Sequence, residues 1–358
     1  MYLNDDNLRS DRNNFTLVRL ILASSVIFTH SYGLIHGMTA DDPFAPWLGK
    51  PISAFAVDGF FFLSGFLVYA SLARRGNVLA FARARLARLW PALAVSVMLC
   101  VLGGIALTNV DLPSYFSGPT LRFMISNLTL QGGGYHLTGV MCDGVLCNIN
   151  GSLWTIPWEV RCYLLLALLG LVGFAGERAM KYVVLPFSLL FALAWQLLAG
   201  GEPAAGGVIY NIAMVDRLWS MFALGIAAYI FRKRIFLSWW VLAFLFAAYL
   251  AALHFSFYAH LDSVFMGYAV LCGGFLTAQS RAVSAQWPDY SYGMYIYAFP
   301  VMMLVHALWR FDNYGWLALA NVAATLPLAA LSWHLVEKPA LEWGRMRPKT
   351  ARPATNQA

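Results

Sequence analysis

Charged residues are scarce in this chain. Only 11% of its 358 residues are Asp, Glu, Lys or Arg, whereas 60% are hydrophobic. A soluble domain of this length has roughly a quarter of its residues charged. The shortage argues against a soluble globular protein, and the many Trp and Tyr residues suit side chains at the level of lipid headgroups. The composition therefore indicates an integral membrane protein.

Cysteine is also sparse, and the five cysteines do not make a disulfide scaffold. Cys100, Cys162 and Cys272 lie in apolar segments, where cysteine usually packs as a small hydrophobic residue. Cys142 and Cys147 share one loop and could form a disulfide if that loop faces an oxidising compartment. The sequence leaves both states of this pair open.

Long apolar runs are what the sequence has in quantity. One crossing of a bilayer takes roughly 20 apolar residues. Runs of this kind lie at 15–36, 51–73, 86–107, 153–174, 181–199, 208–231, 235–254, 260–279, 290–309 and 315–336. The first contains Arg19 and exceeds the apolar core of a signal peptide, so we interpret it as a signal-anchor. The predicted fold is an all-α polytopic membrane protein with about ten transmembrane helices.

The basic residues alternate between the loops. With the N-terminus inside, 18 of the 24 Lys and Arg residues fall in cytoplasmic segments and three in outer loops. This bias predicts that both termini are cytoplasmic. It also accounts for the net charge of +7 without a nucleic-acid partner. We divide the chain into a cytoplasmic tail at 1–12, a membrane domain at 13–339 with a long outer loop at 108–152, and a cytoplasmic tail at 340–358.

A few ionisable side chains lie within the predicted spans, where they are costly and usually mark a pathway, a pair or a site. Arg19 and His30 are eleven residues apart, which places them on one helix face about 16 Å apart along the axis. Glu159 lies at a depth comparable to His30, and Tyr163 shares its face. A carboxylate there could orient the imidazole and stabilise the imidazolium. A snorkelling arginine, a packing histidine and a Glu159–Arg217 pair are the plain alternatives.

Two arginines mark the cytoplasmic mouth of the third span. Arg85 and Arg88 are three residues apart, so on a helix they form one cationic surface able to clamp a phosphate group. The alternative is that they only set the topology.

Several motifs, in the expected order, resemble those of the acyltransferase-3 family of membrane O-acyltransferases. The family acetylates bacterial surface polysaccharides, lipopolysaccharides and related glycans. The resemblance covers about Asn13 to Pro339, with small departures at Gly59 and Trp158. The matching segments are Asn14–Leu20 with Phe28–Tyr32, Val57–Leu67, Arg85–Pro91, Ser152–Glu159, Ser291–Tyr295 and Val336–Pro339.

The resemblance implies roles for individual residues. His30 would be the catalytic histidine, and Glu159 a carboxylate of the same site. The residues expected to bind acyl-coenzyme A are Arg19, Arg85 and Arg88. Further site candidates are Asp58, Ser64, Trp154 and Tyr163. No metal is expected.

The resemblance predicts an O-acyltransferase of the bacterial inner membrane. The expected donor is cytosolic acetyl-CoA, and the expected acceptor is a hydroxyl of a cell-surface glycan or lipid-linked saccharide. The rival hypothesis from another class is a transporter that moves a glycan precursor unchanged, because buried His, Asp, Glu and Arg also suit proton-coupled transport. A third is a scaffold protein, for which changes at Arg19 and His30 would be silent. The paired arginines favour the enzyme, since a transporter has no need of coenzyme A.

Overall fold

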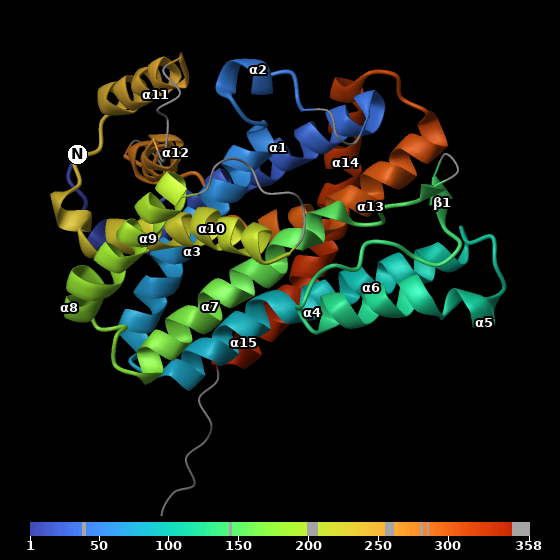
Figure 1. Cartoon of the computed structure of the whole chain (residues 1–358), viewed down its shortest axis with the longest axis horizontal. Coiled ribbons are helices and arrows are strands. Elements are labelled where there is room, and N and C mark those ends of the chain that lie inside the picture. The colour runs from blue at the N-terminus through green and yellow to red at the C-terminus, as the bar shows by residue number, and fades with distance from the viewer. Residues whose placement is uncertain are drawn as a thin grey trace, which may run out of the picture.

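The computed structural model describes residues 1–37, 41–142, 145–198, 207–254, 261–279, 282–284 and 286–345. In these residues the chain is almost entirely helical (Figure 1). The strands there are β1 (Met141–Cys142) and β2 (Val145–Leu146), an antiparallel hairpin with Met141 opposite Leu146. The predicted all-α fold is therefore confirmed. Most of the tail predicted at 340–358 lies outside the described residues.

In the part of the chain that the structure describes, eight helices are long and apolar enough to cross a membrane. Five of them are single elements: α1 (Phe15–His36), α3 (Ile52–Arg75), α4 (Val78–Ile105), α10 (Gly207–Ile230) and α13 (Ser291–Trp309). The other three join successive elements. They are the 3-10 turn η3 (Gly151–Thr155) with α7 (Ile156–Leu171), α8 (Glu177–Ala179) with η4 (Met180–Val184) and α9 (Leu185–Leu198), and α14 (Tyr314–Ser332) with the π turn η7 (Trp333–Glu337) and α15 (Lys338–Arg345). Each overlaps one predicted span.

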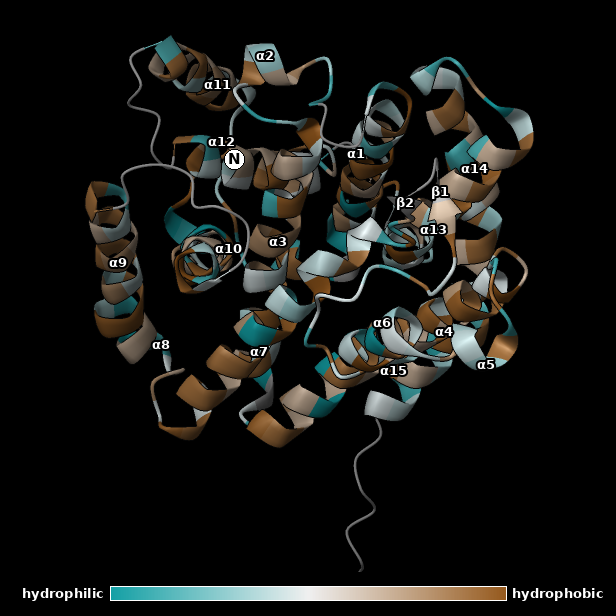
Figure 2. Ribbon diagram, turned by 45° about the vertical axis from the view of Figure 1, so that its right-hand side comes forward, coloured by the Kyte–Doolittle hydropathy of each residue, from teal (hydrophilic) through white to brown (hydrophobic). Residues whose placement is uncertain are grey.

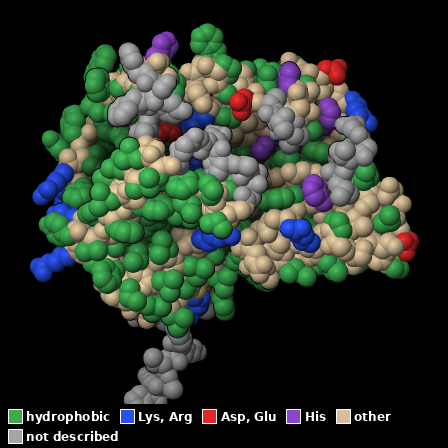
Figure 3. Space-filling model, in the orientation of Figure 1, with side chains coloured by type: hydrophobic (Ala, Val, Ile, Leu, Met, Phe, Trp, Pro, Cys, Tyr) green, Lys and Arg blue, Asp and Glu red, His purple; other side chains and the backbone are tan. Residues whose placement is uncertain are grey.

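The two remaining predicted spans are shorter helices. The run at 235–254 contains α11 (Trp239–His254), and the run at 260–279 contains α12 (Leu261–Leu271), which continues through the π turn η6 (Cys272–Leu276). Figure 2 shows α9 and α11 as largely hydrophobic helices at the periphery of the bundle. Hydrophobic side chains likewise cover much of the surface over α7, α8 and α9 (Figure 3). A helix that is apolar all round needs lipid or protein around it, so the protein is an integral, multi-pass membrane protein.

Helix α4 begins eight residues before the apolar run that predicted it. Helix α3 ends at Gly76, whose φ of +63° and N–H bond to Leu72 form a left-handed cap. The Asn77 side chain then accepts a hydrogen bond from the Ala80 N–H and starts α4. Because the caps fix both ends, Arg85 and Arg88 lie on a helix continuous with the span.

Helices α3 and α10 are in direct backbone contact. A Cβ atom added to Gly65 would collide with the backbone of Phe222, and one added to Gly225 would collide with that of Phe62. Small residues allow transmembrane helices to approach in this way. The contact positions Ser64, the neighbour of Gly65, on the inner side of the bundle.

The long segment 108–152 has ordered structure of its own. It contains α5 (Leu112–Tyr115), α6 (Gly118–Leu128) and the β1–β2 hairpin. Helix α6 packs on α4, and the Trp90 indole N–H donates to the Leu128 carbonyl oxygen at 3.0 Å. Cys147 is disulfide-bonded. The three cysteines predicted as packing residues are free and buried, at Cys100, Cys162 and Cys272.

Candidate active site

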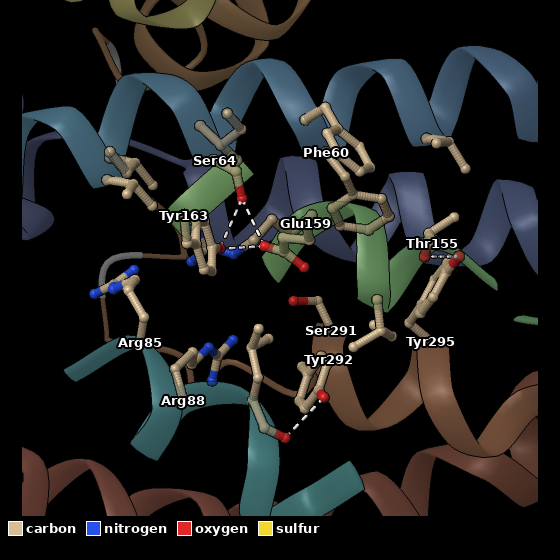
Figure 4. Close-up of a pocket in the computed structure, with 18 of the residues that line it drawn as sticks. Phe60, Ser64, Arg85, Arg88, Thr155, Glu159, Tyr163, Ser291, Tyr292 and Tyr295 are labelled. Carbon is tan, nitrogen blue, oxygen red and sulfur yellow. Dashed lines mark hydrogen bonds between the residues drawn. The ribbon is translucent and has the colours of Figure 1, made fainter. Parts of the chain in front are cut away.

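A cavity of about 150 Å³ lies inside the bundle, between α1, α3, α4, α7 and the start of α13 (Figure 4). It collects six of the nine predicted site residues, which are far apart in sequence. They are Arg19, Ser64, Arg85, Arg88, Glu159 and Tyr163. We refer to it as the arginine cavity. The structure brings these residues together from four helices: α1 and α3 each contribute one of them, and α4 and α7 each contribute two.

Glu159 is held in one wall of the arginine cavity by two hydroxyl groups. Its Oε1 accepts hydrogen bonds from Ser64 Oγ at 2.8 Å and from the Tyr163 hydroxyl, one turn further along α7. In Figure 4 its second carboxylate oxygen points into the cavity, towards Ser291 on the opposite side. The carboxylate is therefore fixed in position by one oxygen and presents the other.

Arg88 and Arg19 are paired with acidic residues that sequence reasoning missed. Arg88 bonds Asp289 Oδ2 through Nη2 at 2.7 Å and Glu337 Oε2 through Nη1 at 3.1 Å. Arg19 lies 3.1 Å from the same Asp289 oxygen, and Ser291 Oγ donates to Asp289 Oδ1 at 2.6 Å. Burial alone would raise the pKa of the Asp289 carboxyl, but the charges of Arg19 and Arg88 outweigh burial and lower it.

The sequence carried a signal for only one of these two acids. Glu337 belongs to the closing motif Val336–Pro339, whereas Asp289 lies two residues before the Ser291–Tyr295 motif. Arg88 and Glu337 are 249 residues apart in the chain, so no helical spacing relates them.

Arg85 differs from the other two arginines. Among the residues that the structure describes, no acidic side chain forms an ion pair with it, and its buried Nε has no hydrogen-bond partner. A buried donor left without an acceptor costs about 1–3 kcal/mol, and more when the group is charged. An anion bound in this cavity would therefore gain the most binding free energy from a hydrogen bond to Arg85.

His30 lines a second, smaller cavity, which we call the histidine cavity. It leaves no room for a water-sized molecule. The imidazole packs edge-on against the Phe299 ring, 5.2 Å away between centroids. Within the described part of the chain, no hydrogen bond holds it. Asn321 lines the same cavity, and its buried Nδ2 also lacks a partner in the described chain.

The two cavities meet at Tyr295, which lines both. Its hydroxyl lies 2.8 Å from Thr155 Oγ1, on the η3 turn. Glu159 thus lines one of these cavities and His30 the other, and no hydrogen bond joins them. Arg19 and His30, whose spacing predicted one face of a shared helix, both lie on α1 and line different cavities.

Two other candidates lie outside both cavities. Asp58 is buried in an ion-pair cluster, 2.7 Å from Lys50 Nζ and 3.1 Å from Arg217 Nη2, and Lys50 also pairs with Asp262. Arg217 therefore pairs with Asp58 and not with Glu159. Trp154 lines a third cavity on the side of the long segment 108–152.

The helical bundle and its buried cluster of arginines, carboxylates and hydroxyls define a membrane-embedded enzyme. Residues 12–334 match the acyltransferase-3 family, described as an acyltransferase domain, and the chain belongs to this family. It is a membrane O-acyltransferase, transferring groups other than aminoacyl groups. The family resemblance drawn from the motifs is thereby confirmed.

Two relatives match almost the whole chain. Nodulation protein 10 of Rhizobium leguminosarum bv. viciae is 28% identical over 358 residues, covering 92% of this chain and 94% of the relative. An O-acetyl transferase of Shigella phage Sf6 is 28% identical over 346 residues, covering 91% and 95%. No solved structure matches the chain.

Proposed function

We propose that this protein transfers an acetyl group from acetyl-CoA to a hydroxyl of a cell-surface glycan in the bacterial inner membrane. Family membership supports the transfer of an acyl group to oxygen. The name of the phage relative, an O-acetyl transferase, supports acetyl as the group. The glycan acceptor follows from the family resemblance of the motifs.

The observation that carries the donor assignment is Arg85 in the arginine cavity, whose buried Nε has no hydrogen-bond partner among the described residues. A planar guanidinium suits the oxygens of a phosphate group and forms paired hydrogen bonds with them. In this proposal Arg85 binds a phosphate of acetyl-CoA. Arg88 and Arg19 are held by Asp289 and Glu337, which balance their charges, so Arg85 supplies the positive charge for the phosphate.

The thioester end of the donor would extend past Glu159 towards Tyr295 and His30. His30 accepts the proton of the acceptor hydroxyl, and that oxygen attacks the thioester carbonyl carbon. The C–S bond then breaks, and the thiolate of coenzyme A takes the proton back from the imidazolium. In the variant mechanism the imidazole nitrogen of His30 attacks the thioester carbonyl carbon, the C–S bond breaks and coenzyme A leaves as the thiolate. The acceptor hydroxyl oxygen then attacks the acetyl-imidazole, the C–N bond breaks, and the thiolate takes up the hydroxyl proton.

The test uses the purified full-length protein in lipid nanodiscs with acetyl-labelled acetyl-CoA and polysaccharide from the source cells. We expect release of coenzyme A thiol and labelled polysaccharide from the wild type, and neither from His30→Ala. Arg85→Ala should raise the KM for acetyl-CoA by roughly tenfold or more, because a hydrogen bond to a charged group contributes about 1.5–3 kcal/mol of binding free energy. The matched control is Arg178→Ala, at an exposed position. Full activity in His30→Ala, or saccharide flux across vesicles without thiol release, would contradict the proposal.

A further inference from the structure

The third cavity, with a volume of about 420 Å³, is within the size range of small-ligand sites. It opens between the long segment 108–152, the η3 turn and the first turns of α10. Its lining combines three aromatic rings with a carboxamide and a guanidinium. The lining residues are Tyr135, Asn148, Gly151, Trp154, Tyr210, Met214 and Arg217.

This lining matches the chemistry of a saccharide. A sugar ring has C–H faces that pack on Tyr and Trp and hydroxyl edges that need hydrogen-bond partners. Asn148 Oδ1 is buried and has no partner in the part of the chain that the structure describes. It therefore offers an acceptor to a hydroxyl group, which can donate to it.

The charges around the cavity favour an uncharged ligand. The guanidinium of Arg217 is the cation of the lining, and its Nε and Nη2 both lie 3.1 Å from Asp58 Oδ1. Asp58 also bonds Lys50, whose other acidic partner is Asp262. The positive charges of Arg217 and Lys50 are thus balanced by the negative charges of the two aspartates. A strongly anionic sugar finds no surplus positive charge here, whereas Arg217 still offers N–H groups to hydroxyl oxygens.

The η3 turn connects this cavity with the histidine cavity. In a 3-10 helix, residues three apart lie on the same edge. Gly151 and Trp154 accordingly line the third cavity, whereas Ser152 lines the histidine cavity and Thr155 the arginine cavity. A Cβ on Gly151 would come within 2.8 Å of the Phe299 ring, which packs on His30. Only the thickness of this turn and one ring therefore separates the third cavity from the imidazole.

We propose that the third cavity binds the acceptor as a neutral saccharide unit, with Trp154 and Tyr210 packing on the sugar ring and Asn148 accepting from a hydroxyl. In this position a hydroxyl of the bound sugar lies next to Gly151 of the η3 turn and points towards His30. This inference rests on the proposed function and assigns its acceptor site.

The test separates the two substrates kinetically. The probe is the neutral oligosaccharide fraction released by mild acid from envelopes of the source cells, used with labelled acetyl-CoA and the full-length protein in nanodiscs. Trp154→Ala and Tyr210→Ala should each raise the KM for the oligosaccharides by roughly three- to tenfold, the effect of losing one aromatic contact. The KM for acetyl-CoA should stay at the wild-type value. Trp154→Phe, which keeps an aromatic face, should recover most of the loss.

Matched controls remove aromatic rings from outside the cavities. Trp316 and Tyr182 are 64% and 68% exposed, and Trp316→Ala and Tyr182→Ala should leave both KM values unchanged. An unchanged KM for the oligosaccharides in both cavity variants would overturn the acceptor site. So would a parallel rise in the KM for acetyl-CoA, or a failure of Trp154→Phe to recover. If the wild-type protein releases no thiol from acetyl-CoA with these oligosaccharides, the proposed function falls, and the acceptor site with it.

Discussion

Arg88 and Asp289 form an ion pair of 2.7 Å that joins α4 to the start of α13 across 201 residues of sequence. Their side chains are only 18% and 16% exposed. Arg19 approaches the same carboxylate from α1, and Glu337 approaches Arg88 from η7. Four segments thus meet at one charge cluster. Arg88 and Arg19 are anchored by these acidic residues, whereas Arg85, one turn before Arg88, forms no ion pair among the described residues.

Removing the Asp289 carboxylate should destabilise the bundle strongly. Asp289→Ala leaves two guanidinium groups short of a partner, and breaking a buried pair in this way costs about 3–5 kcal/mol. Thermal unfolding in detergent, followed by the helical circular dichroism signal, measures the loss. The control is Asp5→Ala, since Asp5 is 57% exposed beside Arg232 and Lys233, and exposed pairs contribute little. Equal melting temperatures for the two variants would contradict this role.

The same pair predicts how stability changes in acid. The pKa of Asp289 is lowered in the folded protein from its ordinary value of 3.8. The stabilisation from its charged form is then complete above about pH 4 and is lost as the pH falls further, because protons bind the unfolded chain first. The melting temperature of the wild type should therefore drop below pH 4 more steeply than that of Asp289→Asn. Parallel curves for the two proteins would rule this group out as the cause.

The composition and the apolar runs predicted the helices well, because both depend on local residue type. Seven of the eight long helices begin within four residues of the first residue of the predicted span, and α4 is the exception. A count of apolar residues cannot detect its start, since the cap at Asn77 and the polar first turns are not hydrophobic. The sequence predicted that Arg85 and Arg88 form one cationic surface, and both line the arginine cavity. Glu159 was predicted beside His30 but lines the cavity of the two arginines.

Contacts between distant segments were beyond the reach of the sequence. Asp58 was a site candidate. Its partners Lys50 and Arg217 come from a loop and from another helix, and they place it in an ion-pair cluster outside the arginine and histidine cavities. The predicted approach of Glu159 to His30 rested on equal depth in the membrane. Depth does not fix direction around a helix axis, and the two residues face different cavities.

The hydroxyl groups around Glu159 give a graded prediction for activity. Tyr163→Phe and Ser64→Ala each remove one hydrogen bond to Oε1 but leave the carboxylate in place. Each should lower kcat by roughly three- to tenfold, whereas Glu159→Ala, which removes the carboxylate itself, should lower it further. Measuring the rate of acetyl-CoA turnover in nanodiscs gives the kcat of each variant and tests this ranking. Wild-type kcat in Glu159→Ala would show that the carboxylate has no role in the reaction.

The close contact of α3 with α10 gives the sharpest packing prediction. Gly65→Ala places a methyl group against the backbone of Phe222, which cannot yield as a flexible side chain can. The helices must then separate, so Ser64 moves away from Glu159 and both stability and acetyl-CoA turnover should fall. Gly103→Ala is the matched control, because no atom lies within 4 Å of the added Cβ and alanine favours a helix by about 1 kcal/mol. We expect a lower melting temperature for Gly65→Ala and an equal or higher one for Gly103→Ala. A Gly65→Ala protein as stable and active as the wild type would mean that the two helices are further apart than this contact requires.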